Sequence, residues 1–150
     1  MLSATADLVR RQSPRAANEA IERAINRSVY FHVEHPNLID RRLEELDEEW
    51  DIERALEANA ATIALTGVVL AATVDRRFLA VPGVVAAFLL QHALQGWCPP
   101  LPVLRRFGLR TAQEINRERV ALKALRGDFN SMPNALGESR GEVALNAARL

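Results

Sequence analysis

Side chains with obvious chemical reactivity are few in this sequence. Its single cysteine, Cys98, excludes an internal disulfide and any metal cage built from several cysteines. A thiol can serve in persulfide transfer, redox chemistry or lipidation when its surroundings lower its pKa. The sequence does not identify such surroundings near Trp97 and His92. We therefore expect Cys98 to pack against its neighbours, and keep it as a candidate reactive thiol.

The histidines and carboxylates of the sequence also give little indication of a metal or catalytic site. His32 and His35 are three residues apart, a spacing that can hold a metal, but no further ligand lies nearby. The acidic residues from Glu44 to Glu53 point in many directions around a helix, as on a solvated face. Glycine-rich phosphate loops, nucleophile elbows and paired catalytic carboxylates are absent from the sequence. We therefore predict a non-enzymatic protein with no cofactor and no metal site.

Two long uncharged segments dominate the middle of the chain. Residues 58–74 contain no charged side chain, and residues 78–97 contain none when His92 is neutral. Each is close to the roughly 20 residues that cross a bilayer as a helix. Only Asp75, Arg76 and Arg77 separate them, so the two helices must be antiparallel. The predicted fold is all-α, a transmembrane helical hairpin with amphipathic cytoplasmic helices on both sides.

The predicted helical arms follow from periodicity and capping signals. Ile21, Ile25 and Val29 mark one apolar stripe before a break at His35-Pro36, and a second helix runs without a breaker from Leu38 to Asp75. Its first part carries a stripe of Ile39, Leu43, Leu46 and Trp50. Thr111 to Glu114 has the form of a capping box, and Gly127 ends the last helix. The predicted segments are a flexible leader (1–15), N-terminal cytoplasmic helices (16–54), the hairpin (55–97), C-terminal cytoplasmic helices (98–127) and a flexible tail (128–150).

Small and polar residues within the hairpin have regular spacings. Small residues at steps of four, three and four predict a close helix contact in lipid; they are Ala60, Ala64, Gly67 and Ala71. Polar residues at similar depths in the two helices predict an intramembrane cluster in which they satisfy one another; they are Asn59, Thr62, Gln91, His92 and Gln95. The alternative is that these polar side chains reach the headgroup region.

Charge is distributed unevenly although the net charge is zero. Residues 40–57 carry nine acidic and three basic side chains, whereas residues 105–126 carry seven basic and two acidic ones. We expect the two blocks to face each other, or one of them to face anionic lipid, and we expect no nucleic-acid binding. Six arginines flank the hairpin against two in its turn, which predicts a multi-pass protein of the inner (plasma) membrane with both termini cytoplasmic. The six are Arg41, Arg42, Arg54, Arg105, Arg106 and Arg110.

The hairpin resembles a known family. Residues 74–78 and the segment from Leu90 through Gly96-Trp97-Cys98-Pro99 are similar to the YgaP-type two-span inner-membrane domain of bacteria, which is often fused to rhodanese sulfurtransferases. The resemblance covers residues 55–108 and implies a two-helix transmembrane hairpin that associates as a dimer. This sequence has no rhodanese domain, so sulfur transfer is not carried over.

Three roles follow. The first is a membrane accessory, anchoring or docking protein, with the bilayer, a second copy of the chain or a cytoplasmic protein as its partners. The second is a soluble helical adaptor, in which the apolar helices form a core or a partner-binding surface. The third is a membrane-bound thiol (persulfide) carrier acting through Cys98. Amphipathic arms offer only narrow apolar stripes to cover two helices that are apolar almost all round, which favours a membrane protein.

Overall fold

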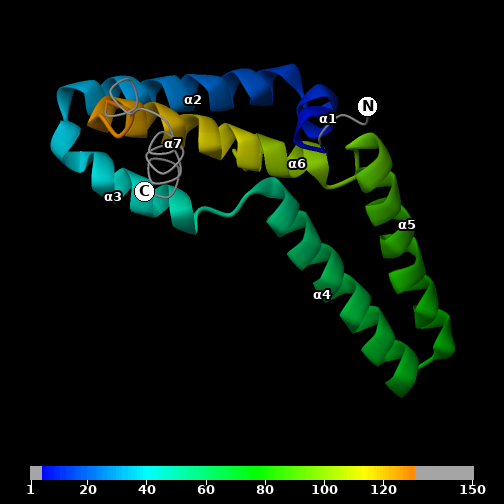
Figure 1. Cartoon of the computed structure of the whole chain (residues 1–150). Helices are drawn as coiled ribbons and strands as arrows, with labels where there is room; N and C mark the ends of the chain where they lie inside the picture. The colour runs from blue at the N-terminus through cyan, green and yellow to red at the C-terminus, as the bar shows by residue number, and fades with distance from the viewer. Residues whose placement is uncertain (1–4, 131–150) are drawn as a thin grey trace, which may run out of the picture. The chain divides into compact units, whose positions relative to one another are not determined.

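The computed structural model describes residues 5–130, and every regular element in that range is helical (Figure 1). The chain divides into two compact units. Within the described range, the hairpin unit comprises residues 5–23 together with Trp50–Glu114, and the α3–α7 unit comprises Ala24–Glu49 and residues 115–130. The all-α fold is thus confirmed. Residues 1–4 of the predicted leader and 131–150 of the predicted tail lie outside the described range.

The N-terminal segment differs from the prediction. Residues 5–12, expected to be part of a flexible leader, form helix α1 (Thr5–Gln12). Val9 is fully buried, and the hydroxyl of Ser13 donates a hydrogen bond of 2.7 Å to the Val9 carbonyl. Helix α2 (Arg15–Glu34) begins directly after Pro14. Burial of the Val9 side chain against the rest of the hairpin unit therefore stabilises a helix that the short local sequence did not predict.

The predicted continuous helix from Leu38 to Asp75 is wrong at one point. After a short 3-10 turn, η1 (Pro36–Leu38), the chain forms α3 (Ile39–Glu48) and then α4 (Ile52–Thr73). Glu49 has extended backbone angles, and the Asp51 carboxylate accepts a 2.7 Å hydrogen bond from the Arg54 amide as an N-cap. Aspartate can therefore start a new helix where the sequence contains neither proline nor glycine.

Helices α4 and α5 (Ala80–Gln95) form the predicted antiparallel hairpin, joined by the 3-10 turn η2 (Arg76–Leu79). Asp75 caps this turn by accepting a hydrogen bond of 2.7 Å from the Arg77 amide. Near the turn α4 approaches α5 at Gly67, where an added Cβ would lie 2.8 Å from Cδ of Pro82. The two helices diverge from there toward the end that carries α6 (Figure 1).

Glycines end three of the later elements. Gly96 follows α5 with φ of +71°, and an added Cβ there would collide with Leu8 of α1. Helix α6 (Leu101–Arg106) is followed by Gly108, and α7 (Ala112–Arg126) by Gly127, both with positive φ. The predicted terminator Gly127 is thus confirmed.

The capping box at the start of α7 is also confirmed. The Glu114 amide donates to the Thr111 hydroxyl at 3.2 Å, and the Thr111 amide donates to the Glu114 carboxylate at 2.9 Å. Just before it, the Ile52 amide donates a 2.8 Å hydrogen bond to the Arg110 carbonyl. This bond ties the start of α4 to the segment that leads into α7.

Each unit has its own small apolar core. In the hairpin unit the buried cluster lies at the end of the hairpin opposite the turn, where α4 begins and α5 ends, which we call the base. The cluster consists of Val9, Ile52, Leu56, Cys98 and Leu101. In the α3–α7 unit it consists of Ile39, Leu43, Leu46, Ile115 and Leu122. The predicted stripe residue Trp50 is half exposed because α3 ends before it.

Candidate functional site

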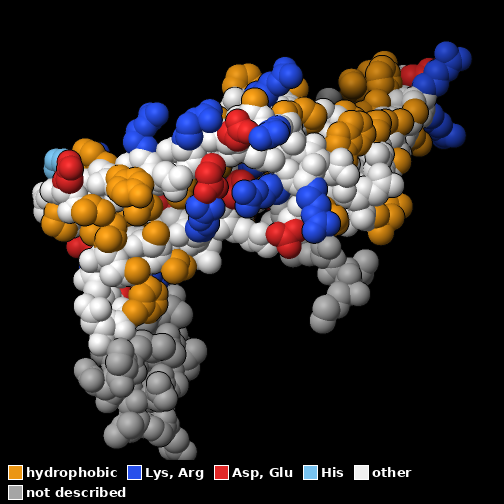
Figure 2. Space-filling view, turned by 90° about the horizontal axis from the view of Figure 1, so that it is seen from above, with side chains coloured by type: hydrophobic (Ala, Val, Ile, Leu, Met, Phe, Trp, Pro, Cys, Tyr) orange, Lys and Arg blue, Asp and Glu red, His pale blue; other side chains and the backbone are white. Residues whose placement is uncertain are grey.

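The hairpin exposes most of its apolar surface. Two helical stretches, within Pro36–Thr73 and Arg76–Gln95, are long and apolar enough to cross a membrane, and only 17% and 6% of their apolar windows are buried. Exposed side chains include Leu65, Val69, Leu90 and Leu94. Apolar side chains gather over the hairpin, whereas charged ones are frequent over the remaining helices (Figure 2). Within the hairpin unit, the other helices therefore leave most of this apolar surface uncovered.

The hairpin's dimensions match a bilayer. The uncharged part of α4, residues 58–73, spans roughly 24 Å at about 1.5 Å per residue. The 16 residues of α5 span roughly 24 Å, and the four residues of η2 add about 8 Å. Both arms thus approach the ~30 Å thickness of a typical hydrocarbon core.

Aromatic and basic side chains flank the hairpin at both ends. Trp50 precedes α4 and Trp97 follows α5, so both tryptophans lie at the base. The Arg54 guanidinium lies 4.4 Å from the centroid of the Trp50 ring. At the opposite end the turn exposes Arg76 and Arg77. This arrangement is typical of the interfacial residues that border a membrane span.

An apolar pocket of about 320 Å³ lies in the divergent end of the hairpin. Its walls come from α4, α5, α6 and the segment between α5 and α6, and include Ile63, Phe88, His92 and Cys98. Only 9% of the His92 surface is exposed, and neither ring nitrogen has a hydrogen-bond partner. A buried imidazole without partners is unusual, because buried polar atoms are nearly always hydrogen-bonded.

Cys98 is placed poorly for thiol chemistry. It is 5% exposed and belongs to the core at the base of the hairpin. Burial raises the pKa of its thiol, and a backbone hydrogen bond at Leu101 offsets this only in part. A raised pKa lowers the thiolate fraction at neutral pH. The geometry therefore favours the packing role of Cys98 over the thiol-carrier role.

The predicted polar cluster is only partly assembled. Asn59 and His92 line the same pocket, but the five side chains are not hydrogen-bonded to one another in the described residues. Asn59 and Thr62 instead donate to the carbonyls of Ala55 and Ala58, each at 2.7 Å. Gln91 is half-buried and Gln95 is exposed. Polar side chains can satisfy themselves within their own helix, which sequence spacing does not reveal.

The stripe of small residues lies on the more covered side of α4. Gly67 is buried against Val81 and Pro82, while the three alanines of the stripe are partly buried. These alanines are Ala60, Ala64 and Ala71. The stripe thus lies on the side toward α5 rather than on the fully exposed side of the hairpin.

Acidic α3 and basic α7 face each other within the α3–α7 unit, as one of the two charge predictions stated. Arg119 pairs with Asp47 and Arg126 with Asp40, each at 2.6 Å. A pair of opposite sense joins Arg42 of α3 to Glu118 of α7 at 2.9 Å. The Glu118 carboxylate also accepts a hydrogen bond from the Ser28 hydroxyl. The two charge blocks thus hold helices of this unit together.

A buried ion pair at the base of the hairpin was not visible in the sequence. Arg105, counted there as a flanking charge, is 1% exposed and binds both carboxylate oxygens of Glu114 at 2.6 and 2.9 Å. It also donates to the Asn18 side chain at 2.6 Å and to the Leu109 carbonyl at 3.0 Å. Burial alone would raise the pKa of Glu114, but hydrogen bonds from Arg105 and Thr111 outweigh it and lower the pKa. The only available signal was that Glu114 ends a capping box.

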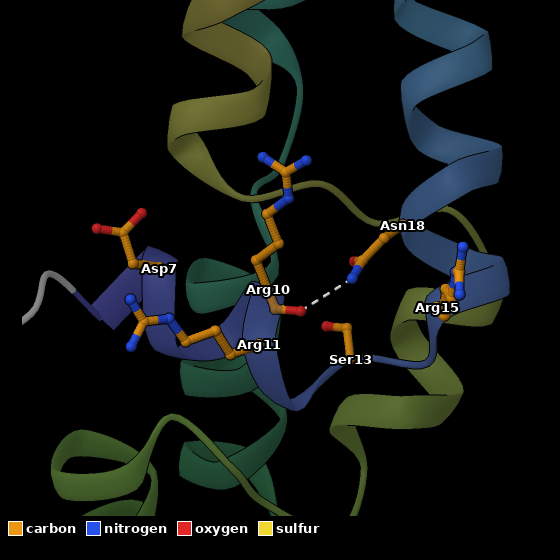
Figure 3. A pocket seen from close by; sticks show the side chains of 6 residues that line it. All are labelled: Asp7, Arg10, Arg11, Ser13, Arg15 and Asn18. Atoms are coloured by element: carbon orange, nitrogen blue, oxygen red, sulfur yellow. Dashed lines mark hydrogen bonds between the residues drawn. The ribbon is translucent and has the colours of Figure 1, made fainter.

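A shallow polar pocket of about 530 Å³ lies between α1 and α2 and is lined by three arginines (Figure 3). Asn18 of α2 reaches the Arg10 carbonyl of α1 at 2.9 Å. Carboxylates accompany the arginines, since Arg10 lies 3.9 Å from Glu22 and Arg15 lies 2.8 Å from Glu19. These exposed pairs reduce the positive potential that an anion would need.

The two histidines near the end of α2 bind the backbone. Nδ1 of His32 lies 2.7 Å from the Ser28 carbonyl, and Nδ1 of His35 lies 2.9 Å from the Phe31 carbonyl. His35 also stacks on the Phe31 ring. Among the described residues no group of three or more candidate ligands could hold a metal ion.

Comparisons of the chain with protein-family models, curated proteins and solved structures find no match. The resemblance to the YgaP-type domain stays a prediction. Any functional inference therefore depends on the geometry of the chain itself.

Proposed function

We propose that this chain is a small, non-enzymatic integral membrane protein, anchored by the α4–α5 hairpin and serving as an accessory or docking protein. The observation that carries the proposal is the exposure of the apolar hairpin surface, of which 17% and 6% is buried in the two windows. Water in contact with this much apolar surface is unfavourable, and monomeric soluble proteins rarely expose such patches. Lipid covers the surface without a further protein partner.

The hydrogen bonds of the polar side chains on α4 support this placement. The threonines of α4 are exposed, yet Thr62, Thr66 and Thr73 each donate to a carbonyl four residues earlier at 2.7–2.8 Å. Such bonds satisfy a hydroxyl inside the helix that bears it, so the side chain can face hydrocarbon at low cost. Charged residues are confined to the turn and the base.

In the proposed orientation, the base of the hairpin and both termini of the chain lie on the cytoplasmic side of the inner membrane. The orienting signal is the excess of arginines near the base over Arg76 and Arg77 in the turn. Although Arg105 is buried in the folded chain, it still counts, because orientation is set as the spans insert. The tryptophans at the base then lie at the cytoplasmic interface.

The α3–α7 unit provides the proposed docking surface. Its basic and acidic blocks largely neutralise each other through Arg119–Asp47 and Arg126–Asp40, while Glu44 and Glu48 of α3 remain exposed. This leaves an acidic outer strip along α3. A cytoplasmic protein with a basic face would fit this strip.

Cell fractionation tests the membrane placement. The full chain is expected in the membrane pellet after a carbonate wash, because only integral proteins withstand the loss of peripheral contacts at high pH. A monodisperse, detergent-free preparation of the full chain would overturn the proposal in favour of the soluble adaptor.

Single-cysteine labelling tests the orientation. In a Cys98→Ser background, Arg76→Cys in the turn should react with a membrane-impermeant maleimide on spheroplasts. The matched control Glu44→Cys on α3 should react only after the membrane is opened. The reverse pattern would invert the proposed topology while leaving the span intact.

A further inference from the structure

The pocket in the divergent end of the hairpin combines apolar walls with two polar side chains, Asn59 and His92, of which Asn59 already donates to the Ala55 carbonyl. Near the turn, α4 and α5 touch at Gly67 and Val81, and the space opens toward the base. Ile63, Val85, Phe88 and Leu89 supply much of the apolar wall. The volume of about 320 Å³ is at the lower end of the ~300–1,000 Å³ range of ligand pockets. It suits a narrow apolar group rather than a large cofactor.

His92 supplies the polar recognition element. Its side chain is more than nine-tenths buried, lines the pocket, and leaves both Nδ1 and Nε2 without partners. A neutral imidazole has one N–H donor and one acceptor nitrogen. An oxygen-bearing group that both donates and accepts, such as a hydroxyl or a protonated carboxyl, would satisfy it.

The lining also limits the class of ligand. Among the described residues no charged side chain lines the pocket, so an ionised phosphate or carboxylate would be buried there without a counter-charge. Phe88 is the one aromatic hydrocarbon side chain in the lining, which gives a flat ring system little to stack against. The remaining fit is an aliphatic chain with a neutral oxygen at its end.

We propose that this pocket binds one aliphatic chain of a single-chain lipid, with a neutral hydroxyl or carboxyl end hydrogen-bonded to His92. The inference rests on the membrane placement proposed above, since the pocket then opens sideways into the bilayer from which such a lipid enters. The hairpin would then bind one specific lipid, in addition to the general lipid shell that surrounds any membrane span.

Photocrosslinking of the full chain in phosphatidylcholine nanodiscs tests this inference. The probe is a hexadecanol analogue with a diazirine in its chain. Labelling should map by mass spectrometry to residues that line the pocket, including Ile63 and Phe88. Unlabelled hexadecanol should compete about threefold to tenfold better than hexadecane, because only the alcohol can form a hydrogen bond with His92. Competition by hexadecanoic acid that fades as the pH rises would distinguish a protonated carboxyl end from a hydroxyl end.

Variants identify the roles of the pocket residues. His92→Leu keeps the apolar volume and should weaken binding about threefold to tenfold, the range expected for one net hydrogen bond. Ala60→Phe should abolish pocket labelling by filling the space. Leu94→Ala, at a position 69% exposed on the same helix, is the matched control and should leave labelling unchanged.

Two results would overturn the inference. Labelling spread evenly over the exposed faces of α4 and α5, with hexadecane competing as well as hexadecanol, would show only the lipid shell. Failure of the chain to enter nanodiscs would overturn the membrane placement and this inference with it. Thermal unfolding of each variant in the nanodisc shows whether lost labelling reflects lost structure.

Discussion

The contact between α4 and α5 at Gly67 gives a prediction whose sign can be worked out from the structure. In Gly67→Ala the new Cβ would lie 2.8 Å from Cδ of Pro82, and 2.9 and 3.0 Å from Cβ and Cγ1 of Val81. Carbon atoms pack best at about 3.5–4.0 Å, so each contact is too short by roughly 0.5–1 Å. Neither neighbour can rotate away easily, because one is a ring and the other is β-branched. The helices must therefore separate.

The size of the effect follows from two opposing terms. Overpacking by one methyl group costs about 1–3 kcal/mol. Alanine is also a better helix former than glycine, which stabilises the folded chain by about 1 kcal/mol in a helix interior. Gly67→Ala should therefore lower the free energy of unfolding by about 0–2 kcal/mol.

Gly83 provides a matched control in the facing helix. An added Cβ there meets nothing within 4 Å, so Gly83→Ala should gain the helix-propensity term alone. Unfolding of the full chain in detergent micelles, followed by circular dichroism during titration with a denaturing detergent, should separate the two variants by about 1–3 kcal/mol. Equal stabilities would refute the close contact, and with it the assignment of the small-residue stripe to the α4–α5 interface.

Three further predictions concern the base of the hairpin. Arg105→Met leaves the buried Glu114 carboxylate without its partner and should destabilise the chain by about 3–5 kcal/mol, whereas Arg105→Met with Glu114→Leu should recover much of the loss in chemical denaturation. The pKa of Glu114 is lowered in the folded chain, so its contribution to stability is complete above the usual value of 4.5 and is lost as the pH falls through the lowered pKa. Glu114→Gln should therefore flatten the acid side of the stability profile, and an unchanged profile would contradict this. Cys98 should react with a small maleimide at neutral pH far more slowly in the folded chain than in the unfolded one, because it is buried and its pKa is raised. Similar rates of maleimide reaction in the folded and unfolded chain would contradict this prediction and would favour the thiol-carrier role.

Local patterns predicted most of the secondary structure. The capping box at Thr111, the terminator at Gly127 and the break at His35-Pro36 all depend on a few neighbouring residues, so their physical causes are visible in the sequence. Two local features were missed for different reasons. The N-cap at Asp51 divides a helix that the sequence predicted as continuous, and α1 depends on the burial of Val9 against distant parts of its unit.

The contents of the candidate site were harder to predict. Spacing alone placed Asn59 and Thr62 near His92, but helix backbone carbonyls compete for such side chains, and the structure gives both hydrogen bonds to the backbone. Burial of Arg105 was not visible either, because arginine is usually exposed and its partner Glu114 belongs to a different helix, in the first turn of α7. These contacts join residues through three-dimensional arrangements that periodicity does not encode.

That two uncharged segments fold back as antiparallel helices could be read from the residues alone, since apolar stretches of that length joined by so short a turn permit little else. That the helices touch near the turn and diverge at the base, leaving His92 in an apolar pocket, is visible only in the folded chain. Hydrophobicity is a property of each residue, whereas a cavity depends on side-chain volumes from several elements that meet at one place.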